Sequence, residues 1–270
     1  MNFFRLTLFC IAVLLSTHAQ ANTTVILRAD QDLTVSALHP KRAESAKTRH
    51  ILSAGIGYTN RAGRMQGYMR FDLGEIPRSD WKTRISIDSA NLHLFVLSHS
   101  LTYEDERYDG KRYLMSISGC HDSSWLETEM TWSTRVCADG GRSQDAKIID
   151  GEHLPAQDTW DVTEQFSRLH ATGQDGVTLI VDAQRLLSCS RDPLEGIGCP
   201  DFPEKRGFLN IASRNREAFG ISVMPRVVVS YSERLTSLMT YANSTLAVIS
   251  AVGVLLGLYG GVRSLRRRRA

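Results

Sequence analysis

Apolar and polar residues alternate with a period of two along several stretches of this chain, and that alternation limits its fold more than any other feature. Between Tyr68 and Leu73, for example, the apolar positions Met69, Phe71 and Leu73 share one face. The same spacing recurs in 90–96, 113–117, 177–181 and 227–231. A period of two places alternate side chains on opposite faces of a strand, and one buried face is typical of antiparallel sheets. The pattern therefore predicts an all-β domain.

One short helix is expected within this β pattern. Asp161 is placed to cap its N-terminus, and Glu164 three residues later completes a capping-box arrangement. Phe166 and Leu169 would then face the core, and Gly173 would end the helix. Many short strands with a single helix favour a jelly-roll-like antiparallel β-sandwich over an up-and-down barrel.

A turn signal, Asp109-Gly110, lies between two of the strand patterns. Because Asp-Gly favours tight turns, we expect a hairpin that joins the strand around 91–98 to the strand around 112–118. No internal repeat, low-complexity tract or linker composition divides 22–234. The sequence predicts one large extracytoplasmic β domain over that range.

The N-terminal segment 1–21 has the pattern of a secretory signal peptide. Arg5 supplies its positive charge, Leu6–Leu15 is its apolar stretch, and Ala19-Gln20-Ala21 is a small-residue cleavage site. We expect the mature chain to begin at Asn22.

The C-terminal segment 235–262 carries no charged residue. As a helix rising 1.5 Å per residue it would be about 42 Å long, which is enough to cross a bilayer with tilt. The tail 263–270 follows with five arginines, and basic residues beside a span mark its cytoplasmic side. We therefore expect a C-terminal transmembrane helix in a single-pass membrane protein, with the N-terminal domain outside the cytoplasm.

Charge follows this division of the chain. Arg5 and the five tail arginines account for six of the 32 basic residues, which leaves 26 against 29 acidic residues in the remainder. The β domain is thus slightly acidic, and the basic tail suits anionic lipid headgroups. The composition gives no reason to expect nucleic acid as a partner.

Four cysteines lie outside the signal peptide. Three pairings are open to four cysteines. We favour Cys120–Cys137 and Cys189–Cys199, because each closes a short local loop. Zinc ligation is the alternative, although no C-x-x-C spacing occurs.

Five short segments in a fixed order suggest a family. They are Tyr68–Leu73, Ala90–Val96, Ser124–Trp132, Trp160–Thr163 and Ser213–Ala218. Together they resemble the DNRLRE domain, also called carbohydrate-binding module family 96, whose pattern runs x-x-R-F-D-L, A-x-L-x-L, W-x-E-x-x-x-T-W, W-D-V-T and S-R-E. The resemblance covers roughly Thr24 to Tyr231 and implies a glycan-binding jelly roll. One departure is Asn215, which separates Arg214 from Arg216-Glu217 and leaves open which arginine matches the S-R-E motif.

Arginines, lysines and exposed aromatic residues would contact such a glycan. Arginine in particular binds sugar carboxylates through paired hydrogen bonds, so an acidic polysaccharide containing uronates is the expected partner. The candidate ligand-binding residues are Lys41, Arg42, Arg61, Arg64, Arg70, Trp81 and Arg216. For Arg70 and Arg216 a salt bridge to Asp72 or Glu217 is the rival interpretation. Trp125, Trp132 and Trp160 occupy motif positions and are expected in the core.

A structural calcium ion is the one cofactor that the sequence suggests. Asp30 and Asp32 flank a bend near the first strand, and hard carboxylate oxygens suit calcium. Crowded acids in 104–109 are a second place for such an ion, although their order does not match an EF-hand loop. Solvated acidic loops are the alternative for both.

No catalytic motif was found. His121, Asp122 and Ser123 are neighbours in sequence, which is a poor arrangement for a catalytic relay. We therefore expect a protein that is not an enzyme. A glycan-processing subunit would need paired carboxylates that the sequence does not mark.

A second interpretation comes from a different class of protein. The segments 71–77, 90–92 and 160–163 are also similar to the β domain of growth-factor propeptides, which bind protein rather than sugar. Here no growth-factor domain follows. The alternative function is therefore a stand-alone adhesion or partner-binding module.

Overall fold

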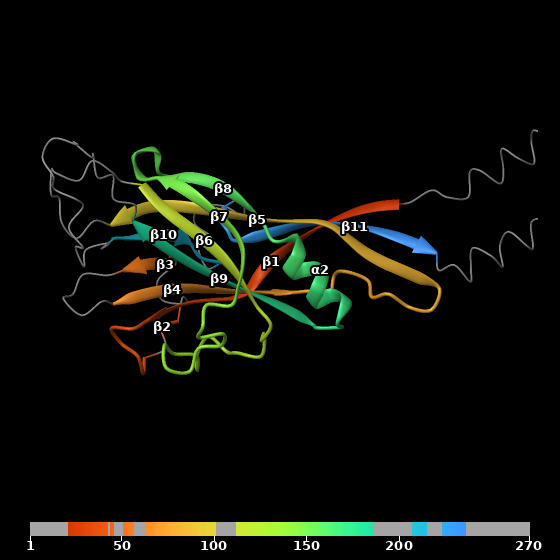
Figure 1. Cartoon of the computed structure of the whole chain (residues 1–270), viewed down its shortest axis with the longest axis horizontal. Helices are drawn as coiled ribbons and strands as arrows, with labels where there is room; N and C mark the ends of the chain where they lie inside the picture. The colour runs from red at the N-terminus through yellow and green to blue at the C-terminus, as the bar shows by residue number, and fades with distance from the viewer. Residues whose placement is uncertain are drawn as a thin grey trace, which may run out of the picture. The chain divides into compact units, whose positions relative to one another are not determined.

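The computed structural model describes residues 21–42, 44–45, 51–56, 63–100, 112–185, 207–214 and 223–235 (Figure 1). Strand accounts for 60% and helix for 8%, so the predicted all-β class with antiparallel pairing is confirmed. One α-helix, α2 (Thr163–Ala171), and one short 3-10 helix, η3 (Gly151–His153), interrupt the strands. The strands are β1 (Ala21–Ser36), β2 (Glu44–Ser45), β3 (Ile51–Ile56), β4 (Arg64–Asp72), β5 (Thr83–Ser100), β6 (Arg112–Cys120), β7 (Arg142–Asp150), β8 (Ala156–Asp161), β9 (Gly176–Arg185), β10 (Gly207–Ala212) and β11 (Arg226–Leu235).

Six strands close into a barrel in the order β1, β11, β5, β10, β3 and β4, with β4 returning to β1. Strand β4 also pairs with β9 over Gly67–Asp72, and β6 and β7 continue the sheet beyond β9. Strand β2 pairs with β1, and β8 pairs with β5. Strands β1, β4, β9 and β6 therefore form one continuous surface, on which the candidate site is built.

The predicted strand faces are confirmed. Each alternating apolar set is buried in the structure, and Met69 and Phe71 are fully enclosed. The other fully enclosed members of these sets include Leu92, Tyr113, Val177 and Val227. Each such side chain contributes about 1.5–3 kcal/mol by leaving water, which is why this pattern dominates the fold.

The prediction of a hairpin that joins the strands on either side of Asp109-Gly110 is wrong. Strand β5 pairs with β10 and β8, whereas β6 pairs with β9 and β7. The turn itself lies outside the described residues. Residues 101–111 separate the two strands, and a connection of that length does not oblige them to be neighbours, as a two-residue turn would.

Helix α2 begins and ends close to its predicted bounds. Val162 occupies the N-cap position, and the Asp161 carboxylate one residue earlier accepts the Thr163 backbone N–H at 2.9 Å. Phe166 and Leu169 are buried, as predicted. The helix ends before Gly173, whose φ of 75° suits glycine.

Two compact units make up the chain. The larger comprises 24–77 and 87–231, and it contains every residue of the site described below. The smaller comprises 1–23, 78–86 and 232–270, of which the structure describes 21–23, 78–86 and 232–235. The predicted single domain 22–234 therefore includes the whole of the larger unit and parts of the smaller one.

The described part of the chain contains no helix with the length and hydropathy needed to cross a bilayer. Nearly all of the predicted signal peptide 1–21 and of the predicted span 235–262, together with the tail 263–270, lies outside the described residues. So do Cys189, Cys199 and the acidic stretch 104–109.

Candidate functional site

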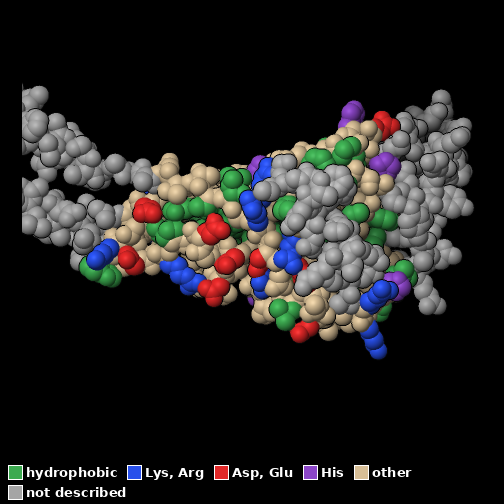
Figure 2. Space-filling model, turned by 180° about the vertical axis from the view of Figure 1, so that it is seen from behind, with side chains coloured by type: hydrophobic (Ala, Val, Ile, Leu, Met, Phe, Trp, Pro, Cys, Tyr) green, Lys and Arg blue, Asp and Glu red, His purple; other side chains and the backbone are tan. Residues whose placement is uncertain are grey.

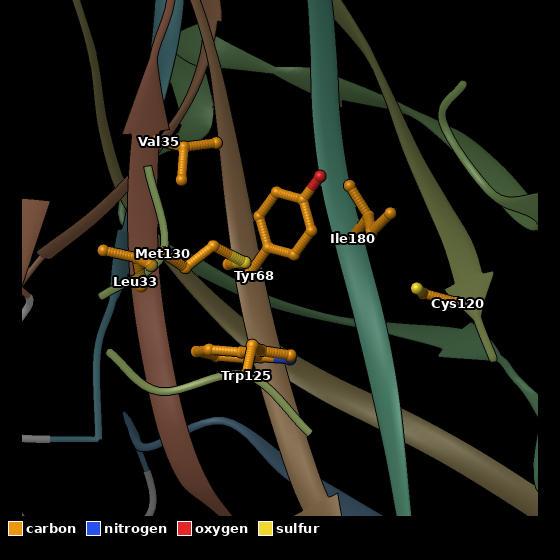
Figure 3. Close-up of a cluster of buried hydrophobic side chains, with 7 residues drawn as sticks. All are labelled: Leu33, Val35, Tyr68, Cys120, Trp125, Met130 and Ile180. Atoms are coloured by element: carbon orange, nitrogen blue, oxygen red, sulfur yellow. The ribbon is translucent and has the colours of Figure 1, made fainter. Parts of the chain in front are cut away.

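Residues 121–141, here called the Trp-loop, cover one face of the β1–β4–β9–β6 surface. On this face Tyr68 and Ile180 lie opposite each other in register, on the side away from Met69 and Leu179. Trp125 and Met130 of the Trp-loop pack over them (Figure 3). These residues belong to a hydrophobic cluster, here called the Trp-loop cluster, whose buried members are Leu33, Val35, Tyr68, Cys120, Trp125, Met130 and Ile180. The loop thus has a hydrophobic core of its own.

Specific contacts fix the Trp-loop in place. The Trp125 ring meets the Tyr68 ring edge-on at 6.3 Å, and its Nε1 donates to Thr178 Oγ1 at 2.9 Å. The Tyr68 hydroxyl donates to the Val136 carbonyl at 3.1 Å, while burial raises the pKa of that hydroxyl to about 12. The predicted Cys120–Cys137 disulfide is confirmed, and it ties the end of the loop to β6.

Five charged residues from four parts of the chain meet beneath the edge of the Trp-loop. They form the charge cluster: Asp30 and Asp32 of β1, Arg70 of β4, Glu127 of the Trp-loop and Arg214 after β10. Asp32 is 0% exposed and Glu127 is 5% exposed, so both carboxyl groups are removed from water. Buried charges of this kind require partners, because their desolvation is costly.

Arg214 supplies most of those partners. Its Nη2 lies 2.8 Å from Glu127 Oε1, its backbone N–H donates to Asp32 Oδ2 at 2.6 Å, and its Nη1 donates to the Asp30 carbonyl. The backbone N–H of Asp32 donates to Glu127 Oε1 at 2.7 Å. Asp32 and Glu127 are therefore joined directly as well as through the same guanidinium.

Arg70 forms the second half of the charge cluster. Its Nε donates to Asp30 Oδ1 and Oδ2 at 3.1 and 3.0 Å, and its Nη1 donates to the Ser123 carbonyl at 3.3 Å. The sequence had suggested Asp72 as the salt-bridge partner. Asp72 Oδ1 instead accepts the backbone N–H of Gly74 at 2.8 Å.

Burial raises the pKa of Asp32 from 3.8 to about 7. The neighbouring Glu127 charge raises it further, while the Arg214 backbone N–H and guanidinium oppose the shift. The charge cluster holds three carboxyl groups and two guanidinium groups. A proton on Asp32 therefore leaves the cluster without net charge, which is the favoured condition for buried groups.

This raised pKa predicts how stability depends on pH. Between about pH 4 and pH 7 the folded protein holds a proton on Asp32 that the unfolded chain has released. The contribution of Asp32 to the free energy of unfolding is therefore fully present below pH 4 and is lost as the pH rises to 7. The free energy of unfolding should fall by roughly 4 kcal/mol over this pH range because of Asp32. We expect Asp32→Asn to match the wild type in urea unfolding near pH 4 and to become progressively more stable than it up to pH 8. A pH-independent difference between the two proteins would contradict the assignment.

A second group of polar residues borders the Trp-loop on the solvent side. Arg64 forms an ion pair with Asp182, and the Gln66 side-chain amide donates to the same Asp182 oxygen at 3.2 Å. Arg64 remains 54% exposed in this pair. Across the Trp-loop edge, the Arg135 guanidinium lies 3.8 Å from the Trp132 ring centroid. A planar cation thus lies against a half-buried aromatic ring.

The turn after β1 adjoins the same edge. The Pro40 carbonyl accepts the Ser133 backbone N–H at 3.0 Å, and the Arg64 carbonyl accepts the Ala37 N–H at 2.8 Å. Lys41 and Arg42 are exposed in this turn. We call the combined surface the binding face, and its residues are Lys41, Arg42, Arg64, Trp132, Arg135 and Asp182. Gln66 is only 3% exposed and contributes by donating to Asp182.

The predicted site residues are thus distributed over three places. Lys41, Arg42 and Arg64 lie on the binding face, Arg70 lies in the charge cluster, and Trp81 belongs to the smaller compact unit. Arg61 and Arg216 lie outside the described residues. On the face drawn in Figure 2, acidic and basic side chains of the described residues are interspersed.

The sequence assigns no role to Glu127, although Glu127 stands in the family-like W-x-E motif, and it leaves open whether Arg214 or Arg216 matches the S-R-E motif. Arg214 lies in the charge cluster, whereas Arg216, the other candidate for the S-R-E position, lies outside the described residues. Trp125 and Trp160 are buried as expected, whereas Trp132 is only half-buried.

Asp30 and Asp32, the suggested calcium ligands, both face arginines. A guanidinium beside each carboxylate takes the place that a cation would need, so the described geometry gives calcium no support at these residues. Among the residues described, Cys120, His121 and Cys137 are the one cluster of metal-ligand types, and its two sulfurs are bonded to each other.

The sequence neighbours His121, Asp122 and Ser123 point their polar groups elsewhere. His121 Nδ1 lies 3.6 Å from Cys137 Sγ. Asp122 Oδ1 accepts both the backbone N–H and the hydroxyl of Ser124, and these bonds lower its pKa.

In comparisons with known proteins, no protein-family model and no curated protein matched this chain.

Proposed function

We propose that this chain is an exported, single-pass membrane protein whose β domain binds an acidic polysaccharide without catalysing a reaction. The domain is of the DNRLRE type, although six of its strands close into a barrel instead of the jelly-roll-like sandwich expected from the sequence, and the segment 235–262 holds it outside the cytoplasm. The signal-peptide pattern, the uncharged C-terminal segment and the arginine tail support the location.

The charge cluster is the observation that carries the family assignment. Arg70, Glu127 and Arg214 come from three of the five family-like motifs, which are far apart in the sequence. In the structure they join into one set of ion pairs and hydrogen bonds, in which Glu127 is buried and the arginines are partly exposed. Residues that meet in this way explain why the motifs occur together, because each motif supplies part of the support for the Trp-loop.

The binding face has the chemistry that an acidic sugar requires. Arg64, Lys41 and Arg42 supply exposed cations, and the partly exposed Asp182 supplies a carboxylate for sugar hydroxyls. Trp132 with Arg135 adds an aromatic edge. Arginine binds carboxylates through two parallel hydrogen bonds, which favours uronates over neutral sugars.

Replacing Arg64 tests this surface. We expect Arg64→Ala to weaken retention of the full-length protein by a polyuronate in affinity electrophoresis about tenfold, because a charge-assisted hydrogen bond is lost. The matched control is Arg142→Ala, which removes an exposed arginine paired with Glu164 of α2 and should leave retention unchanged. Equal retention of wild type and Arg64→Ala would remove Arg64 from the site.

Calcium dependence is measured in the same gels by adding a chelator. Because the Asp30 and Asp32 carboxylates face arginines, we expect retention to be insensitive to chelation. If the folded protein fails to bind neutral and acidic polysaccharides alike, the protein-binding module becomes the better explanation.

A further inference from the structure

The smaller compact unit presents an exposed tryptophan among basic residues. Trp81 is 67% exposed, and the Lys82 ammonium lies 4.7 Å from its ring centroid. Arg78 and Arg84 flank this pair and are also exposed. A tryptophan of this size is normally covered, so its exposure on a short turn requires an explanation.

The turn that carries Trp81 is held rigidly. Asp80 Oδ1 accepts the backbone N–H groups of Lys82 and Thr83 at 2.8 and 2.6 Å, and the Asp80 N–H donates to the Thr83 carbonyl at 2.9 Å. The Ser79 hydroxyl accepts the Ile85 N–H at 2.9 Å. These bonds keep Trp81 at the tip of the turn, and they occupy the Asp80 carboxylate with backbone donors, which lowers its pKa.

The charge of this unit is opposite to that of the rest of the domain. Its described residues include four basic side chains, Arg78, Lys82, Arg84 and Arg234, against two acidic ones, Asp80 and Glu233. The described part of this unit is therefore +2, whereas the whole of 22–234 is −3 by its 26 basic and 29 acidic residues. A basic, tryptophan-bearing surface on an acidic domain suits contact with phospholipid headgroups.

The same unit contains the point where the chain continues toward the predicted membrane span. Ser232–Leu235, the end of β11, belongs to this unit together with the Trp81 turn. The densely apolar part of the following segment begins at Thr245. The residues between Leu235 and Thr245 can extend at most about 35 Å, so the predicted span would hold this unit within that distance of the bilayer surface.

We propose that the turn 78–84 rests on the outer surface of the membrane that anchors the chain. Trp81 lies in the headgroup layer, and Arg78, Lys82 and Arg84 lie beside phospholipid phosphates. This inference rests on the membrane anchoring of the proposed function. It replaces the glycan-contacting role that the sequence suggested for Trp81, and it would fix the orientation of the β domain on the cell surface.

Tryptophan fluorescence tests this contact in the full-length protein. The protein is reconstituted into vesicles of phosphatidylcholine and phosphatidylglycerol, with and without a nitroxide quencher on the headgroup. We expect quenching in the wild type, its loss in Trp81→Phe and its retention in Trp132→Phe. Equal quenching of the wild type and Trp81→Phe would overturn the proposal. So would a change in Trp81 emission that a soluble polyuronate produces without lipid, because that result assigns Trp81 to a glycan.

Two further measurements test the basic residues and the membrane anchor separately. The double variant Lys82→Gln with Arg84→Gln should reduce quenching to the level seen in phosphatidylcholine alone, and unchanged quenching would overturn the role of the basic residues. Retention of the chain after alkaline washing reports on the anchor independently of Trp81. Loss of anchoring and loss of the Trp81 contact are therefore distinguishable results.

Discussion

Replacing Arg214 by alanine should lower the free energy of unfolding by about 3–5 kcal/mol at pH 8, the typical cost of removing one partner from a buried ion pair. The variant leaves Glu127 without its 2.8 Å guanidinium partner and leaves Asp32 without a nearby cation. At pH 5 the loss should be smaller, because Asp32, with a pKa of about 7, already holds its proton there. Urea unfolding at both pH values measures the difference.

The matched control for this variant is Arg142→Ala. Arg142 and Glu164 are each 58% exposed, and surface ion pairs of that kind contribute little. We expect a change within about 0.5 kcal/mol at either pH. A small, pH-independent loss for Arg214→Ala would mean that the charge cluster does not hold the Trp-loop in the way described.

Replacing Trp125 by alanine should lower the free energy of unfolding by about 3–5 kcal/mol, because the substitution empties the centre of the Trp-loop cluster. It removes the edge-on contact with Tyr68 and leaves the Thr178 hydroxyl without its donor. We also expect faster proteolysis within 121–141, while the Cys120–Cys137 disulfide keeps the cleaved loop attached. Unfolding curves and limited proteolysis of the full-length protein measure both effects.

Two substitutions calibrate the Trp125 result. Trp125→Phe keeps an aromatic ring but loses the Nε1 donor, so it should cost about 1–3 kcal/mol. Trp81→Ala removes a tryptophan that is 67% exposed and should change stability by less than about 0.5 kcal/mol. If Trp125→Ala were as mild as Trp81→Ala, the Trp-loop would not be a packed part of the domain.

The sequence predicted the strand faces well, because a strand that is buried on one side needs apolar residues at every second position. It could not predict that Tyr68 and Ile180, on the opposite face, would also be buried. Their cover is the Trp-loop, which has no periodic pattern and reaches them through tertiary packing. The sequence also could not predict which strands pair. Strand β5 pairs with β10 and not with β6, the strand that follows it in the sequence.

The site was predictable only in part. The family-like motifs marked Arg70, Trp125 and Arg214, whose positions in the sequence give no indication of their partners. Arg70 pairs with Asp30, and Arg214 binds Asp32 from 182 residues away. For these two interactions the motifs contain one partner, and the fold brings the other partner to it.

Titration of the full-length protein with a soluble uronate oligosaccharide tests the central claim most directly. We expect saturable binding that weakens as salt is added, persists in chelator and is absent for a neutral oligosaccharide of equal length. Binding of neither sugar by protein that unfolds cooperatively would contradict it.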